Sequence, residues 1–196
     1  MTTPVTTPAG LLLTPGAGAS SESPALVTVE RVLAEAPAPL PVRRVDFPYR
    51  LAGRRMPDRP PVAVAHLRET AAAWAGELGV PTDRLLLGGR SYGGRMCSMA
   101  VAEGLPAAGL VLLSYPLHPP GKPERLRVEH FGAIRVPTLF VSGDKDPFGT
   151  PDELAEHVAA IPGPVTTVTL PGAHDMRGVG RQQAVAEAVA DWVASL

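Results

Sequence analysis

Short apolar runs alternate with helical patterns along this chain of 196 residues, and this alternation limits its fold more than any other feature. The runs are rich in Leu and Val and mostly lack polar alternation, which is typical of parallel strands buried on both faces. They cover residues 10–14, 42–47, 84–89, 109–115, 138–143 and 165–170. Strands that alternate with helices predict an α/β fold of three layers, in which helices cover both faces of a mainly parallel sheet of about six strands.

The segments between these runs place apolar side chains on one face of a helix. Spacings of three and four residues predict helical faces within residues 26–36, 64–78 and 185–196. Thr150, Pro151 and Glu153 predict a capped helix start, and Pro162 and Gly163 predict the end of that helix near residue 161.

Length and composition narrow the class of protein. The chain suffices for one hydrophobic core, so we expect a loose tail over residues 1–9 and a single domain over residues 10–196. Because 18 basic and 19 acidic residues nearly balance, we expect neither a nucleic-acid partner nor a membrane partner. No export signal or membrane-spanning run is visible, which predicts a cytoplasmic protein. Cys97 is the only cysteine, so an internal disulfide is excluded and a buried, inert thiol is expected.

One serine lies among glycines where an apolar run ends. The stretch GGRSYGG places Ser91 between Gly89 and Gly93, directly after the run 84–89 and before a short helical segment. In a G-x-S-x-G turn the serine adopts a strained backbone conformation, and the glycines let strand and helix approach closely. The stretch fits neither a dinucleotide fingerprint nor a phosphate-binding Walker loop, so nucleotide binding is not expected.

Partners for this serine follow later strands. A serine hydroxyl becomes a good nucleophile when a base removes its proton and a third group orients the base. Asp144 and Asp146 follow the run 138–143, and His174 follows the run 165–170. Carboxyl ends of parallel strands lie at one edge of a sheet, so these groups are expected to meet there. The residues alone leave both aspartates open as the third group.

The segments GRSYG, GDKDP and PGAHD resemble the three catalytic segments of the α/β-hydrolase superfamily, and most of all its small, lidless, dienelactone-hydrolase-like members. The resemblance extends from about residue 10 to residue 196. It implies that Ser91 is the nucleophile, that His174 is the general base and later acid, and that Asp146 orients the imidazole. Asp144 and Asp175 then become turn or surface residues. Dienelactone hydrolases proper carry a cysteine nucleophile, whereas position 91 is serine.

The resemblance also implies an oxyanion hole made by the backbone N–H groups of Tyr92 and Ala17. Pro15 stands where relatives often carry histidine, whereas Gly16 keeps the pattern and is a candidate substrate contact. The alternative is that the glycines near Ala17 only form a tight turn. His118 is a second candidate substrate contact, unless its proline-rich loop is merely rigid.

Basic and histidine side chains elsewhere allow other roles. Arg50, Arg54, Arg55 and Arg59 crowd one loop, which is either a solvated basic loop or an attractor for an anionic substrate group. The remaining histidines lack the spacing of metal ligands, so neither a metal nor a cofactor is expected.

These features together predict a serine hydrolase that cleaves a carboxylic ester, thioester or amide through an acyl-enzyme at Ser91. Only about twenty residues separate SYP from VPTLF, which leaves no room for a cap domain and predicts a shallow, open pocket for a small ester-like substrate. The second strand is expected outside the first. The alternative is a non-catalytic interaction module that kept the fold. The oligomeric state is left open.

Overall fold

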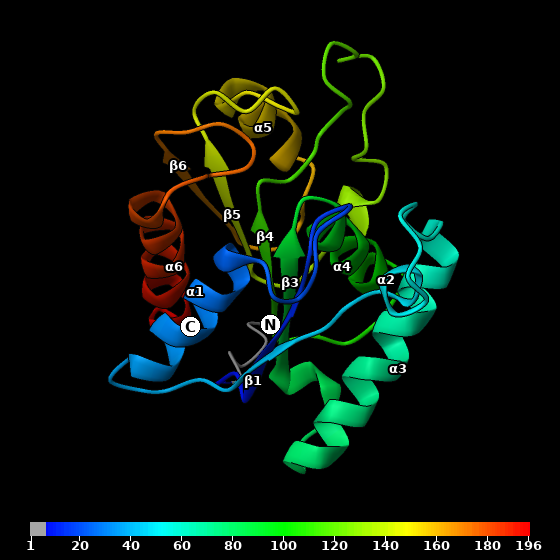
Figure 1. Ribbon diagram of the computed structural model, residues 1–196, viewed down its shortest axis with the longest axis vertical. Helices are drawn as coiled ribbons and strands as arrows, with labels where there is room; N and C mark the ends of the chain where they lie inside the picture. Colours follow the sequence, from blue (N-terminus) through cyan, green and yellow to red (C-terminus); the bar gives the residue numbers. More distant parts are fainter. Residues whose placement is uncertain (1–6) are drawn as a thin grey trace.

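All six apolar runs form strands of one sheet in the computed structural model, which describes residues 7–196. The strands are β1 (Gly10–Thr14), β2 (Val42–Arg44), β3 (Leu85–Arg90), β4 (Gly109–Leu113), β5 (Thr138–Gly143) and β6 (Val165–Leu170). Every neighbouring pair is parallel, and the spatial order is β2-β1-β3-β4-β5-β6 (Figure 1). The predicted α/β class, the number of strands and the outer position of the second strand are therefore confirmed.

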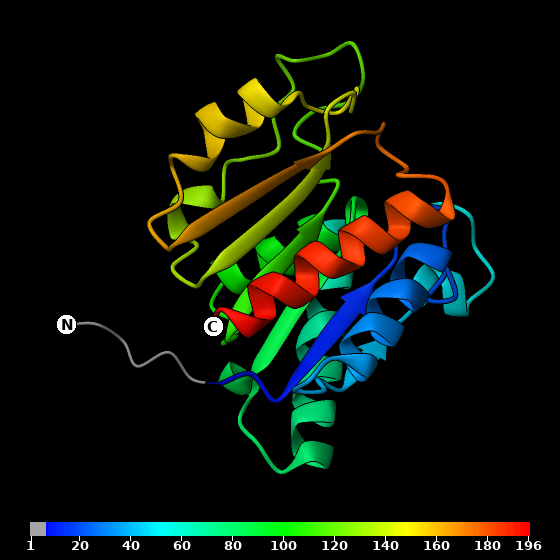
Figure 2. The same ribbon diagram turned by 90° about the vertical axis from the view of Figure 1, so that its left-hand side faces the viewer.

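Helices cover both faces of this sheet. They are α1 (Pro24–Glu35), α2 (Pro48–Leu51), α3 (Pro60–Leu78), α4 (Tyr92–Ala102), α5 (Pro151–Val158) and α6 (Val179–Ala194), with short 3₁₀ helices at Thr82–Arg84 and Phe131–Ala133. Helices α1 and α6 lie side by side on one face, and α3 and α4 lie on the other (Figures 1 and 2). No inserted cap domain is present within residues 7–196.

Alternation of side chains along each strand supplies both halves of the core. In β1, Leu11 and Leu13 pack with α1 and α6, whereas Leu12 faces the opposite side and packs with α3 and α4. All three leucines are fully buried, because a central parallel strand is covered on both faces. The uninterrupted apolar run is thus explained by a sheet between two helical layers.

The strand ends differ slightly from the prediction. Strand β2 ends at Arg44 rather than residue 47. Phe47 is the N-cap of the short helix α2, which the sequence pattern did not predict. Strand β4 ends at Leu113, because Ser114 turns the backbone to a positive φ of 48°. Residues 1–6 of the predicted tail lie outside the described residues. Thr7 and Ala9 each hydrogen-bond to Arg84.

The predicted capped helix start is confirmed in α5, although this helix ends at Val158 and not near residue 161. The Thr150 hydroxyl accepts a hydrogen bond from the Glu153 N–H, and the Glu153 carboxylate accepts one from the Thr150 N–H. This reciprocal pair satisfies two backbone donors that the first helical turn would otherwise leave free. The capping box thus fixes the point at which the loop after β5 becomes helix α5.

Gly93 allows β1, β3 and α4 to approach closely behind Ser91. A Cβ atom at Gly93 would lie 2.5 Å from Thr14 Oγ1 and 2.6 Å from the Pro15 carbonyl oxygen. We expect Gly93→Ala to lower the free energy of unfolding by about 2 to 3 kcal/mol, because backbone must shift to admit the methyl group. Urea denaturation measures this change.

Gly76→Ala is the matched control, because this glycine lies in α3 and no atom is within 4 Å of its added Cβ. Alanine at an open helical site should raise the free energy of unfolding by about 0.5 to 1 kcal/mol. Equal changes in the two variants would contradict the close-approach explanation for Gly93.

Candidate active site

Ser91 lies on the turn that joins β3 to α4. Its backbone has φ 51° and ψ −115°, a conformation that residues other than glycine rarely adopt. The Ser91 N–H donates to the Leu113 carbonyl (2.8 Å), and the Ser91 carbonyl accepts from the Arg95 N–H (3.0 Å). These bonds hold the strained conformation, so the hydroxyl projects from the carboxyl end of β3.

Three side chains from separate loops meet at this turn. His174 Nε2 lies 2.8 Å from Ser91 Oγ, and His174 Nδ1 lies 2.8 Å from Asp146 Oδ2. Asp146 is 3% exposed, and its Oδ1 also accepts a hydrogen bond from the Phe148 N–H (2.9 Å). The loops after β3, β5 and β6 therefore bring Ser91, Asp146 and His174 into one hydrogen-bonded chain.

The neighbouring aspartates have other partners. Asp144 is exposed and accepts a hydrogen bond from the Gly172 N–H at 2.8 Å, so it links the loops after β5 and β6. Asp175 forms an ion pair with Arg177 and lines the cavity beside His174. The expectation of a turn role fits Asp144, whereas Asp175 lies nearer to the site than a simple surface residue would.

The imidazole of His174 is fixed from its face as well as its edge. The Phe148 ring stacks on it with centroids 4.0 Å apart and an angle of 29° between the planes. Because the Phe148 N–H also binds Asp146, a single residue restrains both the ring and the carboxylate. This packing was not visible in the sequence pattern.

A cavity of about 470 Å³ opens at the Ser91 hydroxyl. Its lining includes Gly16, Ala17, Ser91, Tyr92 and His174. Within residues 7–196, neither the Ala17 N–H nor the Tyr92 N–H donates to a protein acceptor. Two backbone donors are thus available beside the serine.

Tyr49 positions the loop that carries Ala17, and Tyr92 contacts the loop between α2 and α3. The Tyr49 hydroxyl accepts a hydrogen bond from the Gly18 N–H (3.2 Å), and the Tyr92 hydroxyl donates to the Asp58 carbonyl (2.7 Å). Burial raises the pKa of both tyrosines, so both hydroxyls stay protonated. The loop after β1 is therefore anchored next to the serine.

The structure corrects the prediction for His118. This side chain is buried, its Nδ1 lies 2.9 Å from the Pro119 carbonyl, and its Nε2 faces Glu153 at 3.4 Å. It is not among the residues that line the Ser91 cavity, because its loop turns it toward α5. The alternative of a rigid, proline-rich loop explains His118 better than substrate contact.

The crowded arginine loop also lies away from the cavity. None of Arg50, Arg54, Arg55 and Arg59 lines it, and Arg54 instead pairs with Asp58 at 2.7 Å. Sequence reasoning missed the arginines that do line it, which are Arg90, Arg95, Arg127 and Arg177. Two of them belong to the stretch GGRSYGGR, in which Arg90 directly precedes Ser91 and Arg95 follows it by four positions; this was the available signal.

Arg90 connects the serine turn to the histidine loop. Its Nη2 donates to the His174 carbonyl (3.0 Å), whereas its buried Nε has no partner within residues 7–196. Burial lowers the pKa of this guanidinium, although Asp175 and Asp146 act in the opposite direction. Arg90 is thus a half-buried cation that positions His174.

Cys97 is buried and His130 is half-buried, and neither lines the Ser91 cavity. Burial raises the pKa of Cys97 to about 12, so it is a thiol, as expected. His130 Nε2 lies 2.8 Å from Ser98 Oγ, and burial together with Arg95 lowers its pKa from 6.5 to about 4. His130 is therefore neutral at pH 7.

Residues 7–196 contain neither a cluster of metal ligands nor a membrane-spanning helix. No group of three or more His, Cys, Asp and Glu side chains is placed to hold a metal ion in this part of the chain. In the same residues, no helix combines the length and apolar character needed to cross a bilayer.

A doubly covered parallel sheet with this serine turn defines the α/β-hydrolase class. A family model described as an alpha/beta hydrolase domain matches residues 7–195. The chain therefore belongs to the alpha/beta hydrolase domain family, as the resemblance of its motifs implied.

Solved structures show the same fold. Dienelactone hydrolase from Anabaena variabilis is 19% identical with a TM-score of 0.76, and the match covers 96% of this chain and 87% of that one. Est1E from Butyrivibrio proteoclasticus, solved with ferulic acid bound, is 18% identical with a TM-score of 0.74, covering 97% of this chain and 90% of that one. An alpha-beta serine hydrolase homologue from Coxiella burnetii is 18% identical with a TM-score of 0.73, and the match covers 93% of this chain and 84% of that one.

Proposed function

We propose that this protein is a serine hydrolase that cleaves a carboxylic ester through an acyl-enzyme on Ser91. The observation that carries the proposal is the continuous chain of hydrogen bonds from the Ser91 hydroxyl through His174 to the buried Asp146 carboxylate. This chain of hydrogen bonds ends at the Ser91 hydroxyl, which faces an open cavity where a substrate can reach it. Membership of the alpha/beta hydrolase family supports the same assignment.

Each group has a role in this reaction. His174 Nε2 takes the proton of the Ser91 hydroxyl as the oxygen attacks the carbonyl carbon, while Asp146 stabilises the imidazolium through Nδ1. The Tyr92 and Ala17 N–H groups donate to the oxyanion of the tetrahedral intermediate. The imidazolium then protonates the departing alcohol, and the acyl-enzyme forms.

Deacylation repeats the sequence with water. His174 removes a proton from a water molecule, the hydroxide attacks the acyl carbonyl, and Ser91 leaves with the proton that His174 returns. These steps need only groups of the chain itself and water. An ester, a thioester or an amide reacts by the same route, and the lack of a cap domain within residues 7–196 favours small, accessible substrates.

Active-site labelling tests the proposal directly. A fluorophosphonate probe should label Ser91, as located by mass spectrometry of the modified peptide, because His174 activates that hydroxyl. His174→Ala should remove the label, whereas His157→Ala on α5 should keep it. A folded natural chain that stays unlabelled would contradict the proposal and favour the alternative, a non-catalytic interaction module.

A further inference from the structure

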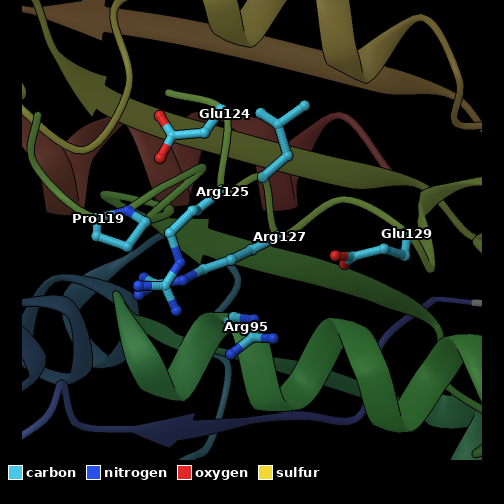
Figure 3. Close-up of a pocket in the computed structure, with 7 residues that line it drawn as sticks. Arg95, Pro119, Glu124, Arg125, Arg127 and Glu129 are labelled. Carbon is cyan, nitrogen blue, oxygen red and sulfur yellow. The ribbon is translucent and has the colours of Figure 1, made fainter. Parts of the chain in front are cut away.

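A second cavity, of about 600 Å³, adjoins the one that holds Ser91. We call it the arginine pocket, because Arg95, Arg125 and Arg127 line it (Figure 3). Arg95 and Arg127 line both cavities, so a molecule bound at Ser91 can extend from one into the other. In Figure 3 the guanidinium groups of Arg125 and Arg127 lie close together, above Arg95 on α4.

Positive charge exceeds negative charge in the lining of this pocket, which has three arginines and two glutamates. Within residues 7–196, none of the three arginines forms an ion pair, although Glu124 and Glu129 line the same pocket. The Nε atom of Arg95 is buried and has no hydrogen-bond partner in this part of the chain. Burial lowers the pKa of Arg127, and the charges of Arg95 and Arg125 lower it further. Adjacent like charges are unfavourable, so a bound anion would stabilise this arrangement.

Two of the three arginines are held in place by the fold. Arg95 lies one helical turn after Ser91 on α4, where its N–H donates to the Ser91 carbonyl (3.0 Å). The Arg127 carbonyl accepts a hydrogen bond from the hydroxyl of buried Tyr115 (2.7 Å). A pocket whose backbone is already fixed loses little conformational entropy when a ligand binds.

We propose that the arginine pocket binds the phosphate group of a phosphorylated ester whose carbonyl lies at Ser91. A phosphate monoester carries nearly two negative charges at neutral pH and accepts paired hydrogen bonds from guanidinium groups. Three arginines exceed what one carboxylate needs, and the volume of the pocket leaves room for the organic part of the substrate. The substrate class rests on the proposed hydrolase function, whereas the phosphate site can be measured separately.

Isothermal titration calorimetry at low salt tests the site itself. It measures the binding of phenyl phosphate to the Ser91→Ala variant. Introducing Arg127→Gln into the Ser91→Ala variant should raise the Kd for phenyl phosphate about tenfold or more, since charge-assisted hydrogen bonds are lost. Arg125→Gln is a second variant at an exposed position, and it should also raise the Kd. Arg135→Gln is the control, because this exposed arginine precedes β5 and lies outside both cavities. It should change the Kd less than about twofold.

Three results of this titration would overturn the phosphate site. They are no binding, equal weakening by Arg127→Gln and Arg135→Gln, and equal affinity for benzoate and phenyl phosphate. Equal weakening would indicate only long-range electrostatic attraction, and equal affinity would indicate a simple carboxylate site. Circular dichroism and thermal unfolding verify that each variant is folded.

Hydrolysis tests the substrate class. Acetate release is compared for propane-1,3-diol monoacetate, 3-acetoxypropyl phosphate and 4-acetoxybutanoate, which share an acetyl group and a short chain. The phosphate ester should have a kcat/KM about tenfold or more above that of the neutral ester, and Arg127→Gln should reduce this ratio. Suppose that Ser91 is labelled and the neutral ester is hydrolysed as efficiently as the phosphate ester. This result would overturn the inferred substrate class and leave the proposed function intact. Phosphate binding that depends on Arg127, without labelling or hydrolysis, would support the site and contradict the proposed function.

Discussion

Ser91→Ala is expected to lower kcat for an activated ester such as 4-nitrophenyl acetate by about 10⁴- to 10⁶-fold. The proposed nucleophile is the hydroxyl oxygen that lies 2.8 Å from His174 Nε2, and alanine removes it without disturbing the turn. The remaining cavity and backbone donors still bind the ester, so a small residual rate is expected. The measurement is kcat from initial rates at saturating ester.

The double variant Ser91→Ala/His174→Ala sharpens this prediction. If the two groups act as one unit, removing the second after the first should change the residual rate very little. If the loss of kcat in the double variant equals the product of two large losses in the single variants, Ser91 and His174 act independently. A Ser91→Ala protein that keeps a tenth of the natural rate would show that this serine is not the nucleophile.

Asp146→Asn is expected to lower kcat about 10³- to 10⁴-fold while the fold stays intact. The carboxylate accepts a hydrogen bond from His174 Nδ1 and so leaves Nε2 free to take the proton of Ser91. An amide at this position can present an N–H group to Nδ1 and favour the opposite tautomer, in which Nε2 carries the proton. The measurement is kcat together with the thermal midpoint of each variant.

Asp144→Asn is the matched control for the carboxylate. Asp144 lies two positions earlier in the same loop, but its partner is the Gly172 N–H and not the imidazole. We expect at most a severalfold change in kcat, since asparagine keeps an acceptor oxygen for that bond. A larger loss from Asp144→Asn than from Asp146→Asn would reverse the assignment of the third group.

Much of the fold was predictable because its signals are local. Uninterrupted runs such as GLLLT and RLLLGG can be buried only between two layers, and this property predicted a parallel sheet. The capping box at Thr150 is contained within four residues, and it was correctly located. The short helix α2 was missed because a single turn gives no helical periodicity.

The candidate site was predictable in its motif residues and not in its surroundings. Ser91, Asp146 and His174 each follow a strand end, so the rule for parallel sheets places them at one edge from the sequence pattern alone. Their roles remain a proposal that the variants test. His118 also follows a strand, but its loop turns it toward Glu153, which no local pattern indicates.

The sequence by itself predicted the parallel sheet, the outer position of its second strand and the three side chains expected at its carboxyl edge, because hydrophobic burial and turn chemistry depend on neighbouring residues. Only the tertiary structure decided that Arg95 of α4 and Arg127 of a distant loop line the same two cavities. Side chains from segments separated in sequence meet only when the loops are folded over the sheet. The charge of the site therefore depends on packing, whereas the order of Ser, Asp and His depends on the sequence.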